Sequence, residues 1–165
     1  MALEIERRFL IKNDNWKEFI TNKIIIEQGY LAQSLDDWIT RIRFTGKDYK
    51  IALKKHITSF TNFEFEYSIP RKDGETIMSN LSNIIKKERF FLEVEKKSWI
   101  IDCFKENNYP LEIAEIELSK EEEDLFLPSF ISKEITGQTH YSNFNLANNP
   151  FSEWKADYLT TFKSD

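Results

Sequence analysis

The chain has little of what disulfide-linked, zinc-binding or low-complexity proteins require. Its 165 residues include one cysteine, Cys103, which excludes an intramolecular disulfide and a zinc site built from cysteines. Only 4 glycines and 4 prolines leave little room for linkers or repetitive segments. We therefore expect a single domain spanning residues 1–165, which is long enough to bury a hydrophobic core.

Long apolar runs and an excess of positive charge are also absent. No apolar stretch approaches the ~20 residues of a membrane-spanning helix. Glu4 and Glu6 stand where a signal peptide has a cationic stretch. The formal net charge of −5 speaks against a general nucleic-acid-binding surface, because neutralising phosphates takes clustered positive charge. We expect a cytoplasmic protein, with neither nucleic acid nor membrane among its partners.

Aromatic residues and a period-two alternation are what the chain does have. Aromatic residues make up 15% of the sequence and include 14 Phe, which favours strands and a well-filled interior. Apolar and polar residues alternate along seven segments, as in strands with one apolar and one polar face. These segments are 3–11, 39–45, 49–55, 62–69, 87–95, 98–104 and 111–119.

Helices are predicted between these strands. Residues 14–23 carry apolar side chains at helical spacing, and residues 74–86 have an apolar stripe behind Asp73, a candidate N-cap. The run Ser119–Glu122 fits a capping box, so a helix is expected to begin there and to end before Pro128.

Two weaker features lie toward the C-terminus. A short turn through Phe130 and Ile131 is expected to stop at Gly137. Residues 152–163 follow Asn149-Pro150 with a weaker helical pattern. These helical segments could cover the apolar faces of the strands from outside.

The polar faces of the strands carry charges of one sign at positions i and i+2. The acidic pairs are Glu4/Glu6, Glu64/Glu66 and Glu115/Glu117, and the basic pairs are Arg41/Arg43 and Lys87/Arg89. Such residues project in the same direction roughly 6–7 Å apart, where two carboxylates repel each other unless solvent or a cation lies between them. Glutamate oxygens suit Mg²⁺ or Mn²⁺, and paired Arg and Lys suit a multiply charged phosphate chain.

Each pair on its own is typical of a strand with a solvated face on an ordinary antiparallel sheet. Five pairs on five segments favour another arrangement, in which helices outside place the charged faces inside a closed barrel. Burying such charges without ligands is unfavourable, which makes the lumen a binding site. An ordinary sheet protein remains the alternative, and it predicts no metal-dependent stabilisation.

The run Glu4-Ile5-Glu6-Arg7-Arg8 resembles the N-terminal ExExK signature of the CYTH family, also called triphosphate tunnel metalloenzymes. Further stretches resemble the short bacterial members, in order along nearly the whole chain. They are Gln28-Gly29-Tyr30-Leu31, Arg41-Ile42-Arg43, Glu64-Phe65-Glu66-Tyr67 with Ile69-Pro70, Lys87-Glu88-Arg89, Ala114-Glu115-Ile116-Glu117-Leu118, and Thr136-Gly137 followed by Asn143-Phe144-Asn145-Leu146.

This resemblance implies an α+β fold: an eight-stranded antiparallel β-barrel, the triphosphate tunnel, with helices packed outside. It implies metal ligands at Glu4, Glu6, Glu115 and Glu117, with Glu64, Glu66 and Asp102 as further acidic lining for Mg²⁺ or Mn²⁺. It implies triphosphate contacts from Arg8, Arg41, Arg43, Lys54, Lys87 and Arg89. The implied catalytic residues are Glu4, Glu6, Arg8 and Lys87. Tyr30 matches a tyrosine near the tunnel, although a core or rim aromatic explains it equally well.

Three positions depart from the family pattern. Arg8 replaces the signature lysine; it keeps the charge and can bind phosphate with two donors, but it is longer. Lys55 and His56 follow Lys54 where similar sequences often have Gly-Lys, and we expect His56 to face solvent. His140 stands where an arginine is common, and an exposed loop histidine is expected there.

The implied activity is metal-dependent hydrolysis of a linear triphosphate, first of all inorganic tripolyphosphate to pyrophosphate and phosphate. Thiamine triphosphatase, nucleoside triphosphatase and adenylate cyclase activities are alternatives within the family, but nothing in the sequence marks a pocket for an organic group. A non-catalytic polyphosphate-binding protein is the alternative of another class. The sequence shows no Ser, Cys or His nucleophile constellation. A homodimer is compatible with the many aromatics.

Overall fold

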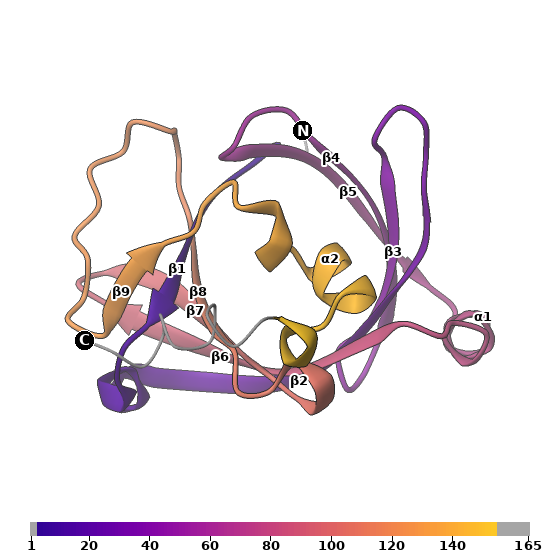
Figure 1. The fold of residues 1–165 in the computed structure, drawn as a ribbon, viewed down its shortest axis with the longest axis horizontal. Helices are drawn as coiled ribbons and strands as arrows, with labels where there is room; N and C mark the ends of the chain where they lie inside the picture. The colour runs from indigo at the N-terminus through magenta and orange to yellow at the C-terminus, as the bar shows by residue number, and fades with distance from the viewer. Residues whose placement is uncertain (1–2, 155–165) are drawn as a thin grey trace.

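The computed structural model describes residues 3–154, which form a nine-stranded antiparallel sheet closed into a barrel (Figure 1). The strands are β1 (Leu3–Ile11), β2 (Ile20–Gln33), β3 (Ile39–Phe44), β4 (Tyr49–His56), β5 (Thr61–Ile69), β6 (Ile84–Val94), β7 (Lys97–Phe104), β8 (Glu112–Glu117) and β9 (Ile131–Glu134). Their order is β5-β4-β3-β2-β6-β7-β8-β1-β9, and β1 also pairs with β5. Strands β1 to β8 thus close the barrel, which confirms the expected eight-stranded wall.

Strand β1 closes the wall by dividing one of its edges between two partners. Residues Leu3–Ile5 pair with Thr61–Phe63 of β5, and the far end of β1 pairs with β9 on that same side. The other edge of β1 pairs with β8. The β1–β5 seam therefore rests on three residue pairs.

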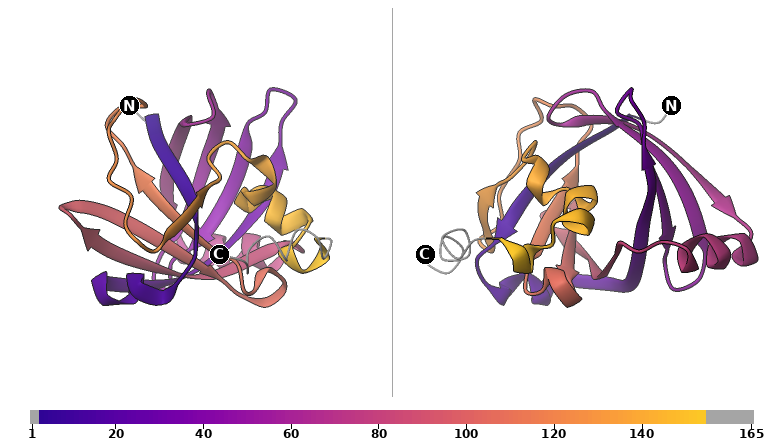
Figure 2. Two further views of the ribbon diagram at one scale, coloured as in Figure 1. Left: turned by 60° about the vertical axis from the view of Figure 1, so that its left-hand side comes forward. Right: turned by 45° about the vertical axis from the view of Figure 1, so that its right-hand side comes forward.

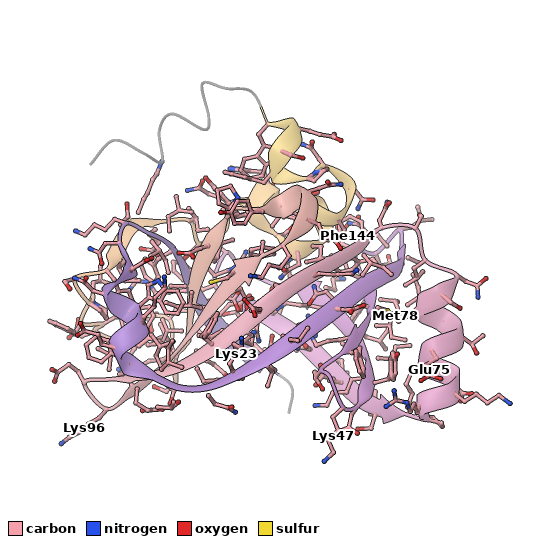
Figure 3. The ribbon with its side chains drawn as sticks, turned by 90° about the horizontal axis from the view of Figure 1, so that it is seen from below. Lys23, Lys47, Glu75, Met78, Lys96 and Phe144 are labelled. Carbon is pink, nitrogen blue, oxygen red and sulfur yellow. The ribbon has the colours of Figure 1, made fainter. Side chains whose placement is uncertain are left out.

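The helical segments are short. They are η1 (Asp14–Phe19), α1 (Arg71–Ser79), η2 (Glu106–Asn108), η3 (Thr139–Tyr141), α2 (Asn143–Asn148) and η4 (Phe151–Glu153), where η denotes a 3₁₀ helix. Helix α1 lies outside the wall beside β3, with the buried Met78 on its barrel side (Figures 1 and 3). Within residues 3–154, no helix is long and apolar enough to cross a membrane.

The predicted helix over residues 14–23 is wrong. The side chain of Asn13 accepts a hydrogen bond from the amide of Asn15 and opens the 3₁₀ segment η1, after which the chain enters β2 at Ile20. The sequence does not predict β2, although it is 14 residues long. Three consecutive isoleucines, residues 24–26, interrupt the alternation that marks the other strands.

The predicted helix over residues 74–86 is partly correct. Helix α1 begins at Arg71 and ends at Ser79, and Pro70 rather than Asp73 occupies the N-cap position. The isoleucines at 84 and 85, which complete the helical stripe in the sequence, instead open β6. Two adjacent apolar residues fit either period, and pairing with β2 decides between them.

The predicted helix after Ser119 is also wrong, since residues 119–127 form turns and irregular structure. The amide and hydroxyl of Ser119 both donate to the carboxylate of Glu123, at 2.8 and 2.7 Å, and this local loop replaces a capped helix. The turn expected near Ile131 is strand β9. Of the helix expected over 152–163, residues 155–163 lie outside the described residues. Residues 152 and 153 belong to η4, and Trp154 is its extended C-cap.

The hydrophobic core is divided between the outer face of the wall and one end of the barrel. Trp16, Trp99 and Phe130 belong to a cluster outside the wall. At the barrel end, Leu10 and Ile113 share the inward faces of β1 and β8 with the charged residues, and they pack with residues of the C-terminal segment. Helix α2 accordingly lies within the outline of the barrel, whereas the sequence places all helices outside it (Figures 1 and 2).

Candidate functional site

The inward faces of the strands line a charged passage, which we call the tunnel. Its central section is bounded by the carboxylates of Glu4, Glu6, Glu64 and Glu115 and by the cations Arg8, Arg41, Arg43, Lys54 and Arg89. These residues come from six strands, and each follows from the i, i+2 pattern of its strand. The alternation thus predicts correctly which side chains share the inward face.

The central section continues into two openings. A side mouth lies along Thr136–Thr139 and has a volume of about 560 Å³. It meets the central section at a neck formed by Glu6, Arg8, Ile39, His56, Ser142 and Phe144, which border both spaces. A second mouth is bordered by Glu117 and shares Glu4, Glu6, Arg89 and Glu115 with the central section.

Lys54 stands among three carboxylates. Its Nζ lies 3.1 Å from Glu4 Oε2, 3.3 Å from Glu6 Oε1 and 3.4 Å from Glu64 Oε2. Burial disfavours the ammonium, but the three carboxylates outweigh burial and raise the pKa of Lys54. This side chain therefore stays charged and serves as the internal counter-ion of the acidic group.

The pKa values of Glu4 and Glu64 are shifted in opposite directions, although both carboxylates contact Lys54. Burial raises the pKa of Glu4 from 4.5 to about 7, aided by the neighbouring Glu64 and opposed by Lys54. Burial also acts on Glu64, yet Arg41 and Lys54 outweigh it and lower its pKa to about 2. Burial thus outweighs the nearby positive charge at Glu4, whereas positive charge outweighs burial at Glu64.

The guanidinium groups of Arg41 and Arg43 have hydrogen-bond donors that the protein does not satisfy, and Arg43 is also weakly paired in charge. Arg41 Nη2 contacts Glu64 Oε1 at 2.6 Å, but Arg43 Nη1 lies 3.7 Å from Glu66 Oε2. Within residues 3–154, the buried Nε atoms of both arginines have no hydrogen-bond partner. Burial, with repulsion from Arg41 and Arg89, lowers the pKa of Arg43 to about 10. An anion in the central section would relieve both deficits.

Asp102 is a completely buried carboxylate on the inward face of β7, directly opposite Arg89 of β6. Lys87 Nζ lies 2.5 Å from Asp102 Oδ2, and Arg89 donates to both Asp102 oxygens at 2.8 Å. Despite burial, Arg89 and Lys87 hold the pKa of Asp102 well below its usual range. Arg89 also reaches Glu115 Oε2 at 3.1 Å, and Glu115 Oε1 accepts from Arg8 Nε at 3.0 Å. This chain of ion pairs connects the buried carboxylate to the tunnel.

Lys87 does not border the central section of the tunnel. Its side chain is fully buried, and burial lowers its pKa to about 8 although Asp102 opposes the shift. Besides Asp102, its Nζ contacts Asn143 Oδ1 at 3.1 Å, at the start of α2. The structure thus places this predicted catalytic residue between β6 and the C-terminal segment.

The remaining predicted residues lie around the central section. Glu66 bonds Lys50 at 2.8 Å, and Glu117 is exposed at the second mouth. Tyr30 borders the tunnel, packs edge-on against Phe144 at 5.2 Å and accepts a hydrogen bond from Gln28. In the described part of the chain, no three His, Cys, Asp or Glu side chains converge to hold a metal ion. The carboxylates expected to bind metal mostly hold Lys and Arg instead.

Sequence reasoning misses several polar residues of the site. Gln28 is fully buried beside Arg43, and its Oε1 has no hydrogen-bond partner in residues 3–154. Asn62 is buried at the side mouth, and Asn143 and Phe144 of α2 border the central section. A buried amide in an otherwise apolar stretch of strand is the signal that points to Gln28.

The two histidines differ from each other. His56 is exposed, as expected, but its exposure is toward the neck of the tunnel. The expectation of an exposed loop for His140 is wrong. It lies half-buried in η3, with its ring 4.3 Å from that of Tyr141 and 5.4 Å from that of Trp154.

The chain is similar to known proteins over most of its length, although no protein-family model matches it. An inorganic triphosphatase from Acetivibrio thermocellus is 32% identical over 157 residues, which cover 94% of this chain and 99% of that protein. The crystal structure of the inorganic triphosphatase NE1496 is 26% identical, with a TM-score of 0.66 over 89% of this chain and 95% of that one. HpAC1 from Hippeastrum shares the fold, at 13% identity and a TM-score of 0.55, over 74% of this chain and 81% of that chain.

Proposed function

The chain belongs to the CYTH family of triphosphate tunnel metalloenzymes, and we propose that it is a metal-dependent triphosphatase that converts inorganic tripolyphosphate to pyrophosphate and phosphate. The observation that carries this proposal is the pair of buried Nε donors of Arg41 and Arg43, which have no hydrogen-bond acceptor within residues 3–154, together with the weak pairing of Arg43 in the middle of the tunnel. A linear polyanion supplies the missing acceptors along its whole length. The likeness to two inorganic triphosphatases supports the same substrate.

The basic residues would bind and orient the phosphate chain. Arg8, Arg41 and Arg43 can each offer two parallel donors to phosphate oxygens, and Lys54 adds a point charge. Because they are held by ion pairs in a partly desolvated tunnel, they can stabilise the negative charge that develops during phosphoryl transfer without reorganising. An anion at Lys54 would also compete with Glu4 and Glu6 for its ammonium.

The carboxylates fit a divalent cation. Glu6 and Glu117 are direct cross-strand partners on β1 and β8, where two like charges repel each other unless a cation lies between them. Burial and the neighbouring Glu64 raise the pKa of Glu4, and a cation bound beside it would favour its ionised form. We propose Glu4, Glu6, Glu115 and Glu117 as ligands of Mg²⁺ or Mn²⁺, since both ions prefer oxygen donors. When bound, the ion would neutralise the phosphates and lower the pKa of a bound water.

Cation affinity is expected to rise between pH 6 and pH 8. With its pKa near 7, Glu4 holds a proton at pH 6, and that proton must leave before the carboxylate can bind a metal ion. The same raised pKa stabilises the cation-free fold below 4.5, a contribution that is lost as pH rises through 7. Titration calorimetry with Mg²⁺ and Mn²⁺ at three pH values measures this dependence. Glu4→Gln should flatten the dependence, and an unchanged pH slope in that variant would contradict the assignment.

The side mouth favours a second candidate substrate. Its volume of about 560 Å³ lies within the range of pockets that hold organic ligands, and neutral polar residues such as Thr136, Gln138 and Asn145 border it. A nucleoside or thiamine triphosphate could place its organic group there while its phosphates occupy the central section.

Phosphate release from tripolyphosphate, ATP and thiamine triphosphate, with Mg²⁺ or Mn²⁺, tests the function and ranks these substrates. We expect tripolyphosphate to be hydrolysed fastest, and Glu4→Gln and Glu117→Gln to lose about a hundredfold or more in kcat. Glu75→Gln is the matched control, because Glu75 pairs with Arg71 on the exposed face of α1. Metal-dependent binding without turnover would contradict the enzyme and support a polyphosphate-binding protein.

A further inference from the structure

The neck of the tunnel contains a histidine, His56, which has no role among the proposed triphosphate-binding residues. His56 lies at the end of β4, two residues after Lys54 and on the same face of the strand. It borders both the central section and the side mouth, as do Glu6 and Arg8. Its imidazole therefore stands where water from the side mouth reaches the phosphate-binding section.

A buried amide fixes the orientation of this ring. Asn62 of β5 is directly opposite His56 in the sheet and is 3% exposed. Its Nδ2 donates to Glu6 Oε1 at 3.4 Å, and its Oδ1 is hydrogen-bonded to His56 Nδ1. The carboxyl of Glu6 is therefore the acceptor and the amide NH₂ of Asn62 the donor in this contact.

The direction of these two bonds fixes the tautomer of His56. Asn62 presents its NH₂ group to Glu6 and its carbonyl oxygen to His56. That carbonyl in turn needs a donor, so the proton of the neutral ring is on Nδ1. The lone pair is then on Nε2, which has no hydrogen-bond partner within residues 3–154. The arrangement leaves a basic nitrogen at the neck.

On the basis of the proposed triphosphatase activity, we propose that His56 is a general base that takes a proton from the attacking water. A triphosphate held by Arg41, Arg43 and Lys54 would bring its terminal phosphate beside Arg8 at the neck. The water oxygen bonds to the terminal phosphorus while the bridging P–O bond breaks. Pyrophosphate leaves with that electron pair, and the water proton moves to His56 Nε2. The ring then returns the proton to solvent in the side mouth.

Other groups are less well placed for this step. Lys54 is held as an ammonium by three carboxylates. Glu4 borders the central section and the second mouth, and it is not part of the neck. Tyr30 is half-buried, and burial raises the pKa of its hydroxyl.

Three substitutions at His56 separate proton transfer from a structural role. His56→Asn keeps a donor close to Asn62 but lacks Nε2, and His56→Gln places a non-basic amide near the Nε2 position. For tripolyphosphate with Mg²⁺, we expect both variants to lose about a hundredfold in kcat, with KM within about twofold and an unchanged melting temperature. His56→Ala should show the same loss, and added imidazole should restore part of its kcat.

The wild-type protein in the same assay distinguishes the two proposals. Absence of wild-type turnover would overturn the proposed function, whereas wild-type turnover with an equally active His56→Asn variant would overturn the general base alone. A raised KM with kcat retained, or full activity in His56→Gln, would show that His56 contributes hydrogen bonding rather than basicity, and would also overturn it.

Discussion

Replacing Arg43 by methionine is expected to remove most tripolyphosphatase activity while leaving the protein as stable as before, or more so. The guanidinium is buried, weakly paired with Glu66 and unsatisfied at Nε, so in the empty protein its desolvation is only partly compensated. We expect the phosphate oxygens of the substrate to supply the hydrogen-bond acceptors that the Arg43 guanidinium lacks. Losing one such preorganised donor typically lowers kcat by about 10²–10³.

Phosphate release and thermal unfolding, measured on the same preparations, check both halves of this expectation. Arg71→Met is the matched control, since Arg71 forms an exposed ion pair with Glu75 and should tolerate the change in both assays. An Arg43→Met protein that keeps its activity but unfolds at a lower temperature would contradict the assignment, because Arg43 would then act as a structural residue.

The second large effect concerns stability. Asp102→Asn is expected to destabilise the protein by about 3–5 kcal/mol, because it leaves the buried Lys87 without its carboxylate partner and Arg89 paired with Glu115 alone. The sign follows from the depressed pKa of Asp102: its ionised form stabilises the fold above the ordinary pKa of an aspartate, and this contribution is lost as pH falls. At neutral pH the full contribution is present.

Urea unfolding at pH 7 measures this loss as a shift of the midpoint. Asp14→Asn is a suitable control, because Asp14 pairs with Lys17 in an exposed position where an ion pair contributes little to stability. Equal midpoints for Asp102→Asn and the wild type would contradict this expectation, because the buried ion pairs would then contribute little to the free energy of unfolding.

The barrel and the sign of its inward charges follow from the sequence because both depend on local periodicity. The pairs Glu4/Glu6 and Arg41/Arg43 face the tunnel as their spacing predicts. Strand β2 cannot be predicted in this way, because the isoleucines at 24–26 do not alternate with polar residues. The loop after Ser119 is mispredicted as a helix, because a capping motif also fits a local turn.

Burial within the inward face cannot be predicted from alternation. Lys87 and Arg89 have the same sequence pattern, yet only Arg89 reaches the open tunnel. The difference comes from Asn143 and the rest of the C-terminal segment, which fill one end of the barrel from a distant part of the chain. The same limit applies to His56, whose position at the neck depends on how α2 and residues 136–139 border the side mouth.

The small number of residue pairs in the β1–β5 seam links occupancy of the tunnel to integrity of the wall. Glu4 lies on β1 and Glu64 on β5, and Lys54 of the adjacent β4 contacts both across the shortest junction in the barrel. A cation bound between Glu4 and Glu64 would connect β1 to β5 across this junction. Cation binding would then stabilise the closed wall, because the bound ion favours the state in which the two strands are paired.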